Sequence, residues 1–327
     1  MSPHSFALLR LIADGEFHSG EALARALEVS RGTVWNAVRA LEAADLVVYK
    51  VQGRGYKLAQ RVSLLDSEAV ERFAGAHAHR LHIEIADAVD STNSELSRRA
   101  AADAPSGSVL AAEWQPNGRG RMGRPWQAGL GRALAFSLLW RYAQGASALS
   151  GLSLAVGVAV VRALRGIGAS DVELKWPNDV LWRGRKVAGI LVELSGDALG
   201  PSAVVVGIGV NVRLSEAMRA RIDQPAADLE SACGRELDRN AVLGSLLAKL
   251  VDVLDGFAAE GFAPLREEWE GYHAYQGRRV TVTLPGGAVD TGIARGIADD
   301  GALLFESGNA VRRLHSGEIS LRSATRA

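Results

Sequence analysis

The periodicity of the apolar residues changes twice along this chain, and each change marks a different kind of fold. In the first 60 residues the apolar positions recur at helical spacing and then alternate as in strands. Between about 64 and 272 strand and helix patterns alternate, and from about 275 only short strand patterns remain. Since 327 residues are enough for two or three domains, we predict an α+β multidomain protein with domains at 1–62, 63–273 and 274–327.

The first segment predicts three short helices followed by a hairpin. Ser30 can cap the third helix, in which Val34, Val38 and Leu41 would face inward. Two alternating runs follow, joined by a glycine-containing turn at 52–55. This order is typical of a winged helix-turn-helix, whose third helix enters the major groove of DNA. The residues expected to contact DNA are Arg31, Thr33, Trp35, Asn36, Arg39 and Arg54.

The charge of this segment argues for weak DNA binding by one copy. Residues 1–62 contain eight Lys or Arg against six Asp or Glu, a surplus of only two. Affinity for the DNA backbone grows with the number of phosphates neutralised. A winged helix that only packs on its neighbours therefore stays an alternative.

The middle segment predicts one sheet backed by helices. Strands are expected at 82–89, 108–113, 133–140, 172–176, 187–194 and 203–210, and helices at 93–102, at 152–164 and around 243–254. The uncharged window 142–161 has the length of a membrane span. Its glycine, serine and glutamine residues favour instead a strand end, a loop and a buried helix. In the tail, turn signals recur every eight to ten residues, which predicts a small SH3-like barrel.

The composition gives three further expectations. The 37 basic and 37 acidic residues cancel, so the overall charge points neither to nucleic acid nor to a membrane as a partner. Cys233 is the only cysteine, which excludes an intrachain disulfide and favours a reducing, cytoplasmic location. The N-terminus lacks the basic region of a signal peptide, and we expect none.

A glycine-rich loop at 118–123 matches G-x-G-x-x-G, the dinucleotide fingerprint, but its surroundings do not. That fingerprint opens a helix and is followed about 20 residues later by an acidic residue. Here Pro125, Gly129 and Gly131 follow, and residues 114–170 contain seven arginines and no Asp or Glu. The pattern excludes a Rossmann site.

The same loop is better suited to an anion. Arg119, Arg121 and Arg124 offer paired donors to a carboxylate or phosphate, and the glycines let backbone amides approach it. A solvated basic loop is the alternative, but it does not explain why glycine alternates with arginine.

A second group of charged residues surrounds a predicted strand end. Lys175 closes a strand, Pro177 blocks its continuation, and Asn178 and Asp179 form a polar corner. Lys186 then opens the next apolar strand, and a lysine in that position can neutralise an anion in a pocket. A surface ion pair between Lys186 and Asp179 is the alternative.

The remaining signals are weak singly. Residues 90–93 form a helix cap, and the glycines of 207–211 permit close approach of a ligand. His77, His79 and His82 lack the further ligands that a zinc site needs. No nucleophile elbow and no Walker loop is present.

Together these motifs resemble one family, the bifunctional biotin protein ligases that double as biotin-operon repressors. The resemblance covers essentially the whole chain. After the winged helix it runs through DSTN at 90–93, Gln115 with GRGRMGRPW at 118–126, KWPND at 175–179, KVAGILVEL at 186–194, GIGVN at 207–211 and GEISLR at 317–322. It implies a class II synthetase-like biotin ligase domain in the middle of the chain and an SH3-like domain at its end.

The resemblance also implies the reaction and the residues that serve it. Biotin and MgATP give biotinyl-5′-adenylate, and a lysine of the biotin carboxyl carrier protein of acetyl-CoA carboxylase then takes the biotin. The catalytic residues would be Lys186, Arg121 and Asp179. Biotin would be bound by Ser91, Thr92, Asn93, Gln115, Arg119, Gly120, Arg121 and Lys186. ATP and the adenylate would be bound by Gly118, Arg124, Trp126, Lys175, Asn178, Asn211 and Arg322. Mg²⁺ would arrive with ATP, with Asp179 organising either Mg²⁺ or Lys186.

Repression, by the same resemblance, would need an adenylate-bound homodimer on operator DNA. The recognition helix departs from the family, because Asn36 and Ala37 follow Trp35 where many relatives have basic residues. Three rivals remain. They are a transcription factor that only binds its effector, a lipoate or octanoate transferase relative, and a ligase that has lost repression.

Overall fold

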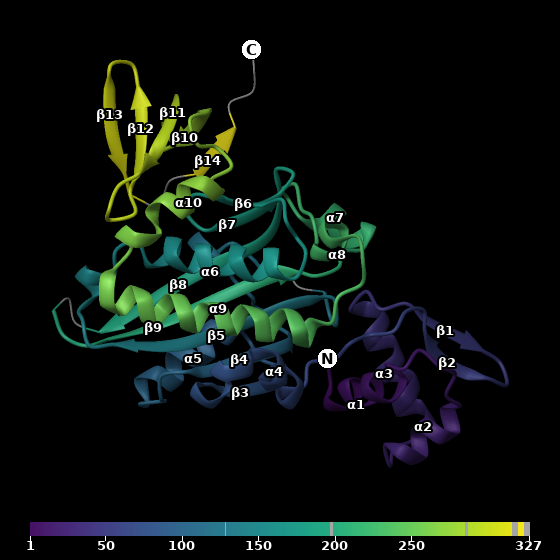
Figure 1. The fold of residues 1–327 in the computed structure, drawn as a ribbon. Coiled ribbons are helices and arrows are strands. Elements are labelled where there is room, and N and C mark those ends of the chain that lie inside the picture. Colours follow the sequence, from purple (N-terminus) through teal and green to yellow (C-terminus); the bar gives the residue numbers. More distant parts are fainter. Residues whose placement is uncertain (128, 197–198, 285–286, 316–319, 324–327) are drawn as a thin grey trace.

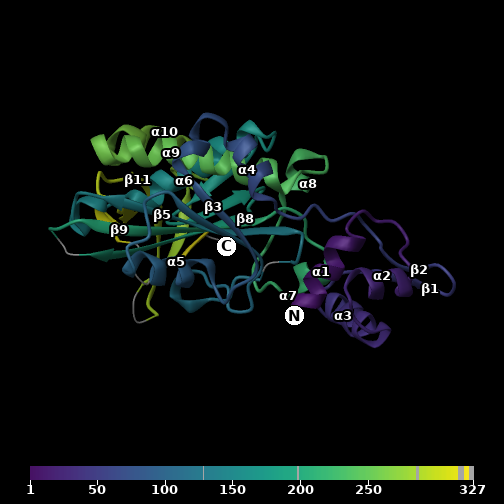
Figure 2. The same cartoon turned by 90° about the horizontal axis from the view of Figure 1, so that it is seen from below.

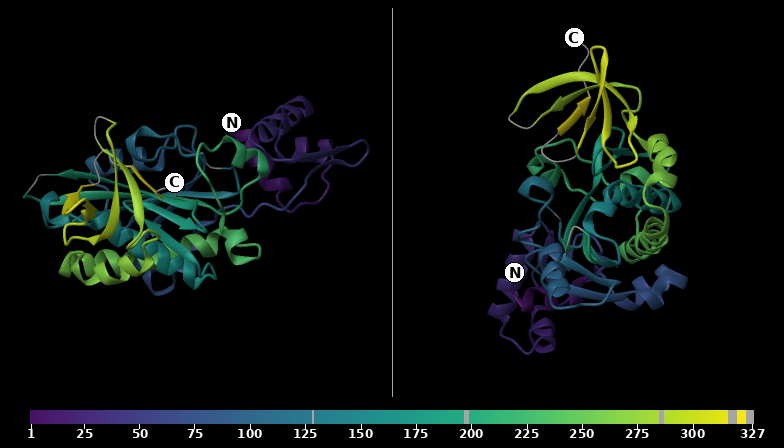
Figure 3. Two further views of the ribbon diagram at one scale, coloured as in Figure 1. Left: turned by 90° about the horizontal axis from the view of Figure 1, so that it is seen from above. Right: turned by 90° about the vertical axis from the view of Figure 1, so that its left-hand side faces the viewer.

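The computed structural model describes residues 1–127, 129–196, 199–284, 287–315 and, for the backbone alone, 320–323. Three units are arranged along the molecule. The winged helix and the C-terminal sheet lie at opposite ends of a larger central domain (Figures 1 and 3). The predicted domain limits fall between structural elements, in the links between Leu58 and Ser67 and between Tyr272 and Arg279.

The N-terminal unit has the predicted winged-helix order. It consists of α1 (Pro3–Ile12), α2 (Gly20–Ala26), α3 (Arg31–Ala43), β1 (Val48–Val51) and β2 (Gly55–Leu58). The Ser30 hydroxyl accepts a hydrogen bond from the Thr33 amide at 3.1 Å, which satisfies one free donor at the start of α3. Val34, Val38 and Leu41 are buried, as their spacing predicted.

The central domain is built on a seven-stranded sheet in the order β3-β4-β5-β9-β8-β7-β6. Its strands are β3 (His82–Ala88), β4 (Ser108–Trp114), β5 (Ala133–Tyr142), β6 (Val172–Lys175), β7 (Asp179–Trp182), β8 (Arg185–Gly196) and β9 (Ser202–Asn211). β3 and β4 are parallel, and the other neighbours are antiparallel. Sequence analysis missed β7, because this four-residue strand begins at Asp179, inside the predicted polar corner.

Helices cover both faces of this sheet (Figure 2). One face carries α6 (Leu152–Gly166), α9 (Arg239–Glu260) and α4 (Ser67–Ala74), and the other carries α5 (Thr92–Ala101). The shorter helices are α7 (Glu216–Arg221), α8 (Leu229–Cys233) and α10 (Arg266–Tyr272). The window 142–161 holds the end of β5, a 3-10 turn and most of α6, as predicted. Among the described residues, no helix combines the length and apolar character needed to cross a membrane.

The C-terminal unit is a small antiparallel sheet in the order β13-β12-β11-β10-β14, which confirms the predicted β domain. Its strands are β10 (Arg279–Thr283), β11 (Val289–Ile297), β12 (Leu303–Ser307), β13 (Ala310–Leu314) and β14 (Ser320–Ser323). Part of the motif at 317–322 lies outside the described residues.

The winged helix is packed on the central domain through apolar and charged contacts. Leu130, which follows the glycine-rich loop, is buried in the core of the winged helix. Asp45 forms an ion pair with Arg221 of α7 at 2.6 Å. The buried Arg239 donates hydrogen bonds to the Ser63 carbonyl in the link between the two units. The two units are therefore joined by more than their covalent link.

Candidate active site

A cavity of about 140 Å³ lies on the α5 side of the central sheet. The N-terminus of α5, the loop at 118–126 and the glycine-bearing faces of β8 and β9 surround it. Thirteen of the predicted catalytic, biotin and ATP residues line it. They are Ser91, Thr92, Asn93, Gln115, Arg119, Gly120, Arg121, Arg124, Trp126, Lys175, Asn178, Asp179 and Lys186.

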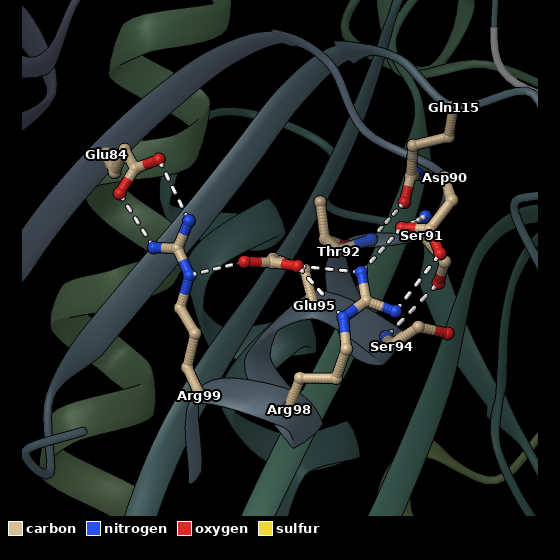
Figure 4. Close-up of polar contacts among 9 residues, drawn as sticks. All are labelled: Glu84, Asp90, Ser91, Thr92, Ser94, Glu95, Arg98, Arg99 and Gln115. Carbon is tan, nitrogen blue, oxygen red and sulfur yellow. Dashed lines mark hydrogen bonds and ion pairs between the residues drawn. The ribbon is translucent and has the colours of Figure 1, made fainter. Parts of the chain in front are cut away.

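The turn that starts α5 is held from both sides (Figure 4). The Asp90 carboxylate accepts a hydrogen bond from the Ser91 amide at 2.8 Å and two from the Arg98 guanidinium at 3.2 and 3.3 Å. The Arg98 hydrogen bonds, with that of the Ser91 amide, lower the pKa of Asp90. From the β4 side, the Gln115 side-chain oxygen accepts from the Thr92 amide at 2.6 Å. The network continues through Glu95 and Arg99 of α5 to Glu84 of β3.

Asn93 forms the floor of the cavity and is itself buried. Its side-chain oxygen lies 2.5 Å from the Ser137 hydroxyl, and its amide nitrogen donates to Glu193 at 2.9 Å. Gly207 gives it room, because a Cβ there would lie 1.9 Å from the Asn93 oxygen. Asn93 is therefore fixed against the sheet before any ligand binds.

Ser137 and Glu193 are the polar residues around this floor that sequence analysis missed. The side chain of Glu193 accepts from Asn93 and also pairs with Arg119 at 3.0 Å. The signal was available in strand alternation, since 189, 191 and 193 share one face of β8. Arg119 lines the cavity, but its guanidinium is engaged by this carboxylate.

The glycine-rich loop folds back on itself and does not open a regular helix. The Gly120 amide donates to the Arg124 carbonyl, and the Trp126 amide to the Gly118 carbonyl, both at 2.7 Å. Residues 121–123 form a single 3-10 turn with Met122 at φ 57°. This geometry agrees with the exclusion of a dinucleotide fingerprint, which must start a helix.

The cations of both predicted groups meet at one end of the cavity. The Lys186 ammonium lies 2.6 Å from one Asp179 oxygen, and the Lys175 ammonium lies 3.7 Å from the other. The Arg121 guanidinium donates to the Asn178 side-chain oxygen at 3.5 Å. Burial lowers the pKa of Arg121, and the Asp179 carboxylate opposes that shift. The Lys186–Asp179 pair exists, but the two side chains are only 17% and 15% exposed and do not form a surface ion pair.

Trp126 packs directly on the sheet at Gly209. A Cβ at Gly209 would lie 2.3 Å from the indole ring. We expected the glycines at 207 and 209 to allow close approach of a ligand; both line the cavity, and they also give room to Asn93 and Trp126. The Lys186 ammonium lies 5.6 Å from the centre of the Trp126 ring. The indole N–H is buried and has no acceptor among the described residues, which is uncommon for a buried donor.

Two predicted nucleotide residues, Asn211 and Gly118, are not among the described residues that line the cavity. The Asn211 amide donates to the backbone carbonyls of Ala227 at 3.1 Å and Lys186 at 3.4 Å, so it braces the backbone beside the site. Gly118 lies under the loop, where a Cβ would meet the Trp126 carbonyl at 2.9 Å. Arg322 lies in β14, but its side chain is outside the described residues.

The predicted DNA-contacting residues form an outer surface of the winged helix. Arg31, Trp35, Asn36, Arg39 and Arg54 are exposed, and Thr33 is half-buried. The Arg39 guanidinium stacks over the Trp35 ring at 4.8 Å, which holds both residues on the exposed side of α3.

Profiles of known families match all three units. The profile of the Biotin/lipoate A/B protein ligase family matches residues 85–211, and that of the Biotin protein ligase C terminal domain matches residues 275–322. An HTH domain profile matches residues 4–57.

Similar proteins cover the whole chain or its larger part. The "Bifunctional ligase/repressor BirA" of Salmonella typhimurium is 38% identical over 97% of both chains. The "Biotin--[acetyl-CoA-carboxylase] ligase" of Paracoccus denitrificans is 39% identical over 66% of this chain and 90% of its own. The solved structure of the biotin protein ligase from Aquifex aeolicus in complex with biotin and ATP matches 74% of this chain and 99% of its own. That match has a TM-score of 0.64 at 30% identity. The chain belongs to the family of bifunctional biotin protein ligases that also act as repressors.

Proposed function

We propose that this protein activates biotin with ATP and transfers it to a lysine of a carrier protein, in the cytoplasm. In the first step the biotin carboxylate attacks the α-phosphorus of ATP, and the bond to pyrophosphate breaks. In the second step the lysine amine attacks the acyl carbon of biotinyl-5′-adenylate, and AMP leaves. The carrier would be the biotin carboxyl carrier protein of acetyl-CoA carboxylase, in line with the names of the relatives.

The observation that carries this proposal is the position of Arg121, Lys175 and Lys186 on one cavity. The first step brings a carboxylate and a phosphate together, and their repulsion raises its barrier. Fixed cations directed at the charge that develops between them lower that barrier. No covalent enzyme intermediate is required, in agreement with the lack of a nucleophile motif.

The other residues of the cavity fall into two groups, one that would bind biotin and one that would bind the nucleotide. The Ser91, Thr92 and Gln115 side chains offer the donors and acceptors that the ureido ring of biotin needs. The buried Trp126 N–H and the Asn178 side chain lie beside the cations, where the nucleotide would bind. Arg119 and Arg124 would shape the loop that closes over the adenylate and keeps water away.

The described residues do not form a metal site of their own. No group of three His, Cys, Asp or Glu that could hold an ion occurs among the described residues, and Asp179 already contacts two lysines. Of the two roles expected for Asp179, this geometry supports the positioning of Lys186. We propose that Mg²⁺ arrives on the phosphates of ATP, and no step is assigned to it through a protein ligand.

The ligase proposal is tested by incubating the full chain with biotin, ATP and Mg²⁺. We expect pyrophosphate release, followed by biotin transfer to a carrier domain. Biotin binding without pyrophosphate release would support an effector-binding transcription factor instead. Faster turnover with lipoate or octanoate would support the transferase alternative.

We propose that the adenylate-bound protein forms a homodimer that binds operator DNA and represses transcription. One winged helix carries a small excess of positive charge, so pairing two of them would add two weak half-site contacts. Analytical ultracentrifugation with and without biotinyl-adenylate tests the dimer. Selection of bound duplexes from random DNA, at a fixed salt concentration, tests the repressor. Equal recovery with the Arg39→Ala variant would contradict the proposed DNA surface.

A further inference from the structure

A second cavity, of about 200 Å³, lies where the winged helix meets the central domain. Val47, Leu58 and Ala59 of the wing and its link form one wall, and Arg132 and Val212 lie on the central domain. Measured in the same way, the candidate active site has about 140 Å³. The junction therefore has room for a small molecule.

Arg132 lines this cavity without an acidic partner. Its side chain is half-buried, and within the described part of the chain it makes no ion pair or side-chain hydrogen bond. Burial and the neighbouring Arg213 cation lower the pKa of Arg132, and only Asp45 opposes them. Asp45 is itself held by Arg221 at 2.6 Å. A partly buried cation without a counter-ion is unfavourable, so the site favours an anion.

Apart from the exposed Arg61, the other charged residues that line the cavity are already paired. Arg213 contacts Glu230 and Glu236, and donates to Gln60 at 3.1 Å. Arg239 is paired with the buried Glu113 at 2.7 Å. The two glutamates that line the cavity, Glu230 and Glu236, are thus both paired with Arg213. Among the described residues, the lining arginines that form no ion pair are Arg61 and Arg132.

We propose that this cavity binds a small organic monocarboxylate. The carboxylate would accept paired hydrogen bonds from the Arg132 guanidinium, and its hydrocarbon part would lie against Val47, Leu58 and Ala59. The site is separate from the candidate active site, which has its own cations on the α5 side of the sheet. Because both walls contribute, a bound carboxylate holds the winged helix to the central domain and stabilises the folded chain.

The test is calorimetric titration of the full chain with hexanoate, with 1-hexanol and inorganic phosphate as matched probes. We expect hexanoate to bind and to raise the Tm, and neither 1-hexanol nor phosphate to do so. In Arg132→Gln the affinity should fall at least tenfold. In Ala59→Phe, which fills the cavity and leaves its charges in place, binding should be lost.

Arg132→Gln also tests the observation that the Arg132 side chain has no ion pair or hydrogen bond within the described part of the chain. Because Arg132 has no internal partner, this variant should keep or exceed the Tm of the wild type. A clear fall in its Tm would mean that Arg132 serves the fold and would overturn the proposal. So would an absence of hexanoate binding, equal binding of phosphate, or unchanged hexanoate affinity in Arg132→Gln. The last result would place the carboxylate elsewhere, such as among the cations of the active site.

Discussion

The Lys186 ammonium lies 2.6 Å from the Asp179 carboxylate, across the hairpin formed by β7 and β8. The second oxygen of the same carboxylate faces Lys175 at 3.7 Å. One acidic residue thus orients two cations toward the cavity. The proposed roles of the pair differ. Lys186 would contact the reacting anions and neutralise their charge, and Asp179 would position the Lys186 side chain.

Replacing Lys186 with alanine should lower the rate of adenylation by roughly 10²–10³-fold, the usual effect of removing one preorganised donor from developing negative charge. Pyrophosphate release measures that rate. The matched control is Lys249→Ala on α9, where the side chain is 46% exposed and pairs with Asp252. Near-normal turnover by Lys186→Ala would remove the residue from the proposed mechanism.

Asp179→Asn should slow adenylation less than Lys186→Ala, because the cation remains and only its positioning is lost. The double variant should then be no slower than Lys186→Ala alone. The rates of pyrophosphate release from the wild type, the two single variants and the double variant give the coupling energy between Asp179 and Lys186. Additive losses would show that Asp179 acts independently of Lys186.

Gly209→Ala should displace Trp126, because the new methyl group would lie 2.3 Å from the indole ring. We expect weaker substrate binding, measured as a higher KM for ATP or biotin. Gly256→Ala is the control, since that helical glycine has open space around its Cβ position and alanine suits a helix. Unchanged KM values in Gly209→Ala would show that the position of Trp126 does not matter.

Several features of the fold and of the candidate active site follow from local sequence signals. Ser30 caps α3 and Lys175 ends β6 as predicted, because caps and strand ends depend on neighbouring residues. The roles of Gly207 and Gly209 could not be predicted, because Asn93 and Trp126 reach them from distant parts of the chain. Local patterns show that a glycine leaves room, but they do not show which side chain takes it.

Asn211 shows the same limit. The family resemblance implied a nucleotide contact for Asn211, and in the structure its side chain ties two backbone segments together. In contrast, Glu193 could have been found from strand alternation. Its charge after the apolar run 187–192 was the signal.

The stability of the protein should fall in mild acid because of His273. This side chain is 6% exposed, and burial lowers its pKa from 6.5 to about 4. Between these values the unfolded chain binds a proton that the folded chain does not, so stability is lost as the pH falls from 6.5 toward 4. The full effect is about 3 kcal/mol.

Urea unfolding of the wild type and of His273→Phe, at pH 7.5 and pH 4.5, measures this contribution. The phenyl ring can keep the packing against Trp269, whose ring centre lies 4.7 Å away. The variant should lose less stability on acidification than the wild type. His4→Gln, at an exposed position, should behave as the wild type does. Equal acid sensitivity of wild type and His273→Phe would exclude His273 as the cause.

The buried pair of Glu113 in β4 and Arg239 in α9 should be the most sensitive charged contact where the linker packs on the central domain. Their side chains are 4% and 2% exposed, and Glu113 also accepts from the Leu65 amide at 2.7 Å. Glu113→Gln leaves the Arg239 charge buried without a counter-ion, which should cost about 3–5 kcal/mol in the free energy of unfolding. Glu21→Gln, in the exposed pair with Arg25, should change it by less than about 1 kcal/mol. Urea unfolding compares the two, and a similar small effect in both would mean that water or a local shift compensates the buried charge.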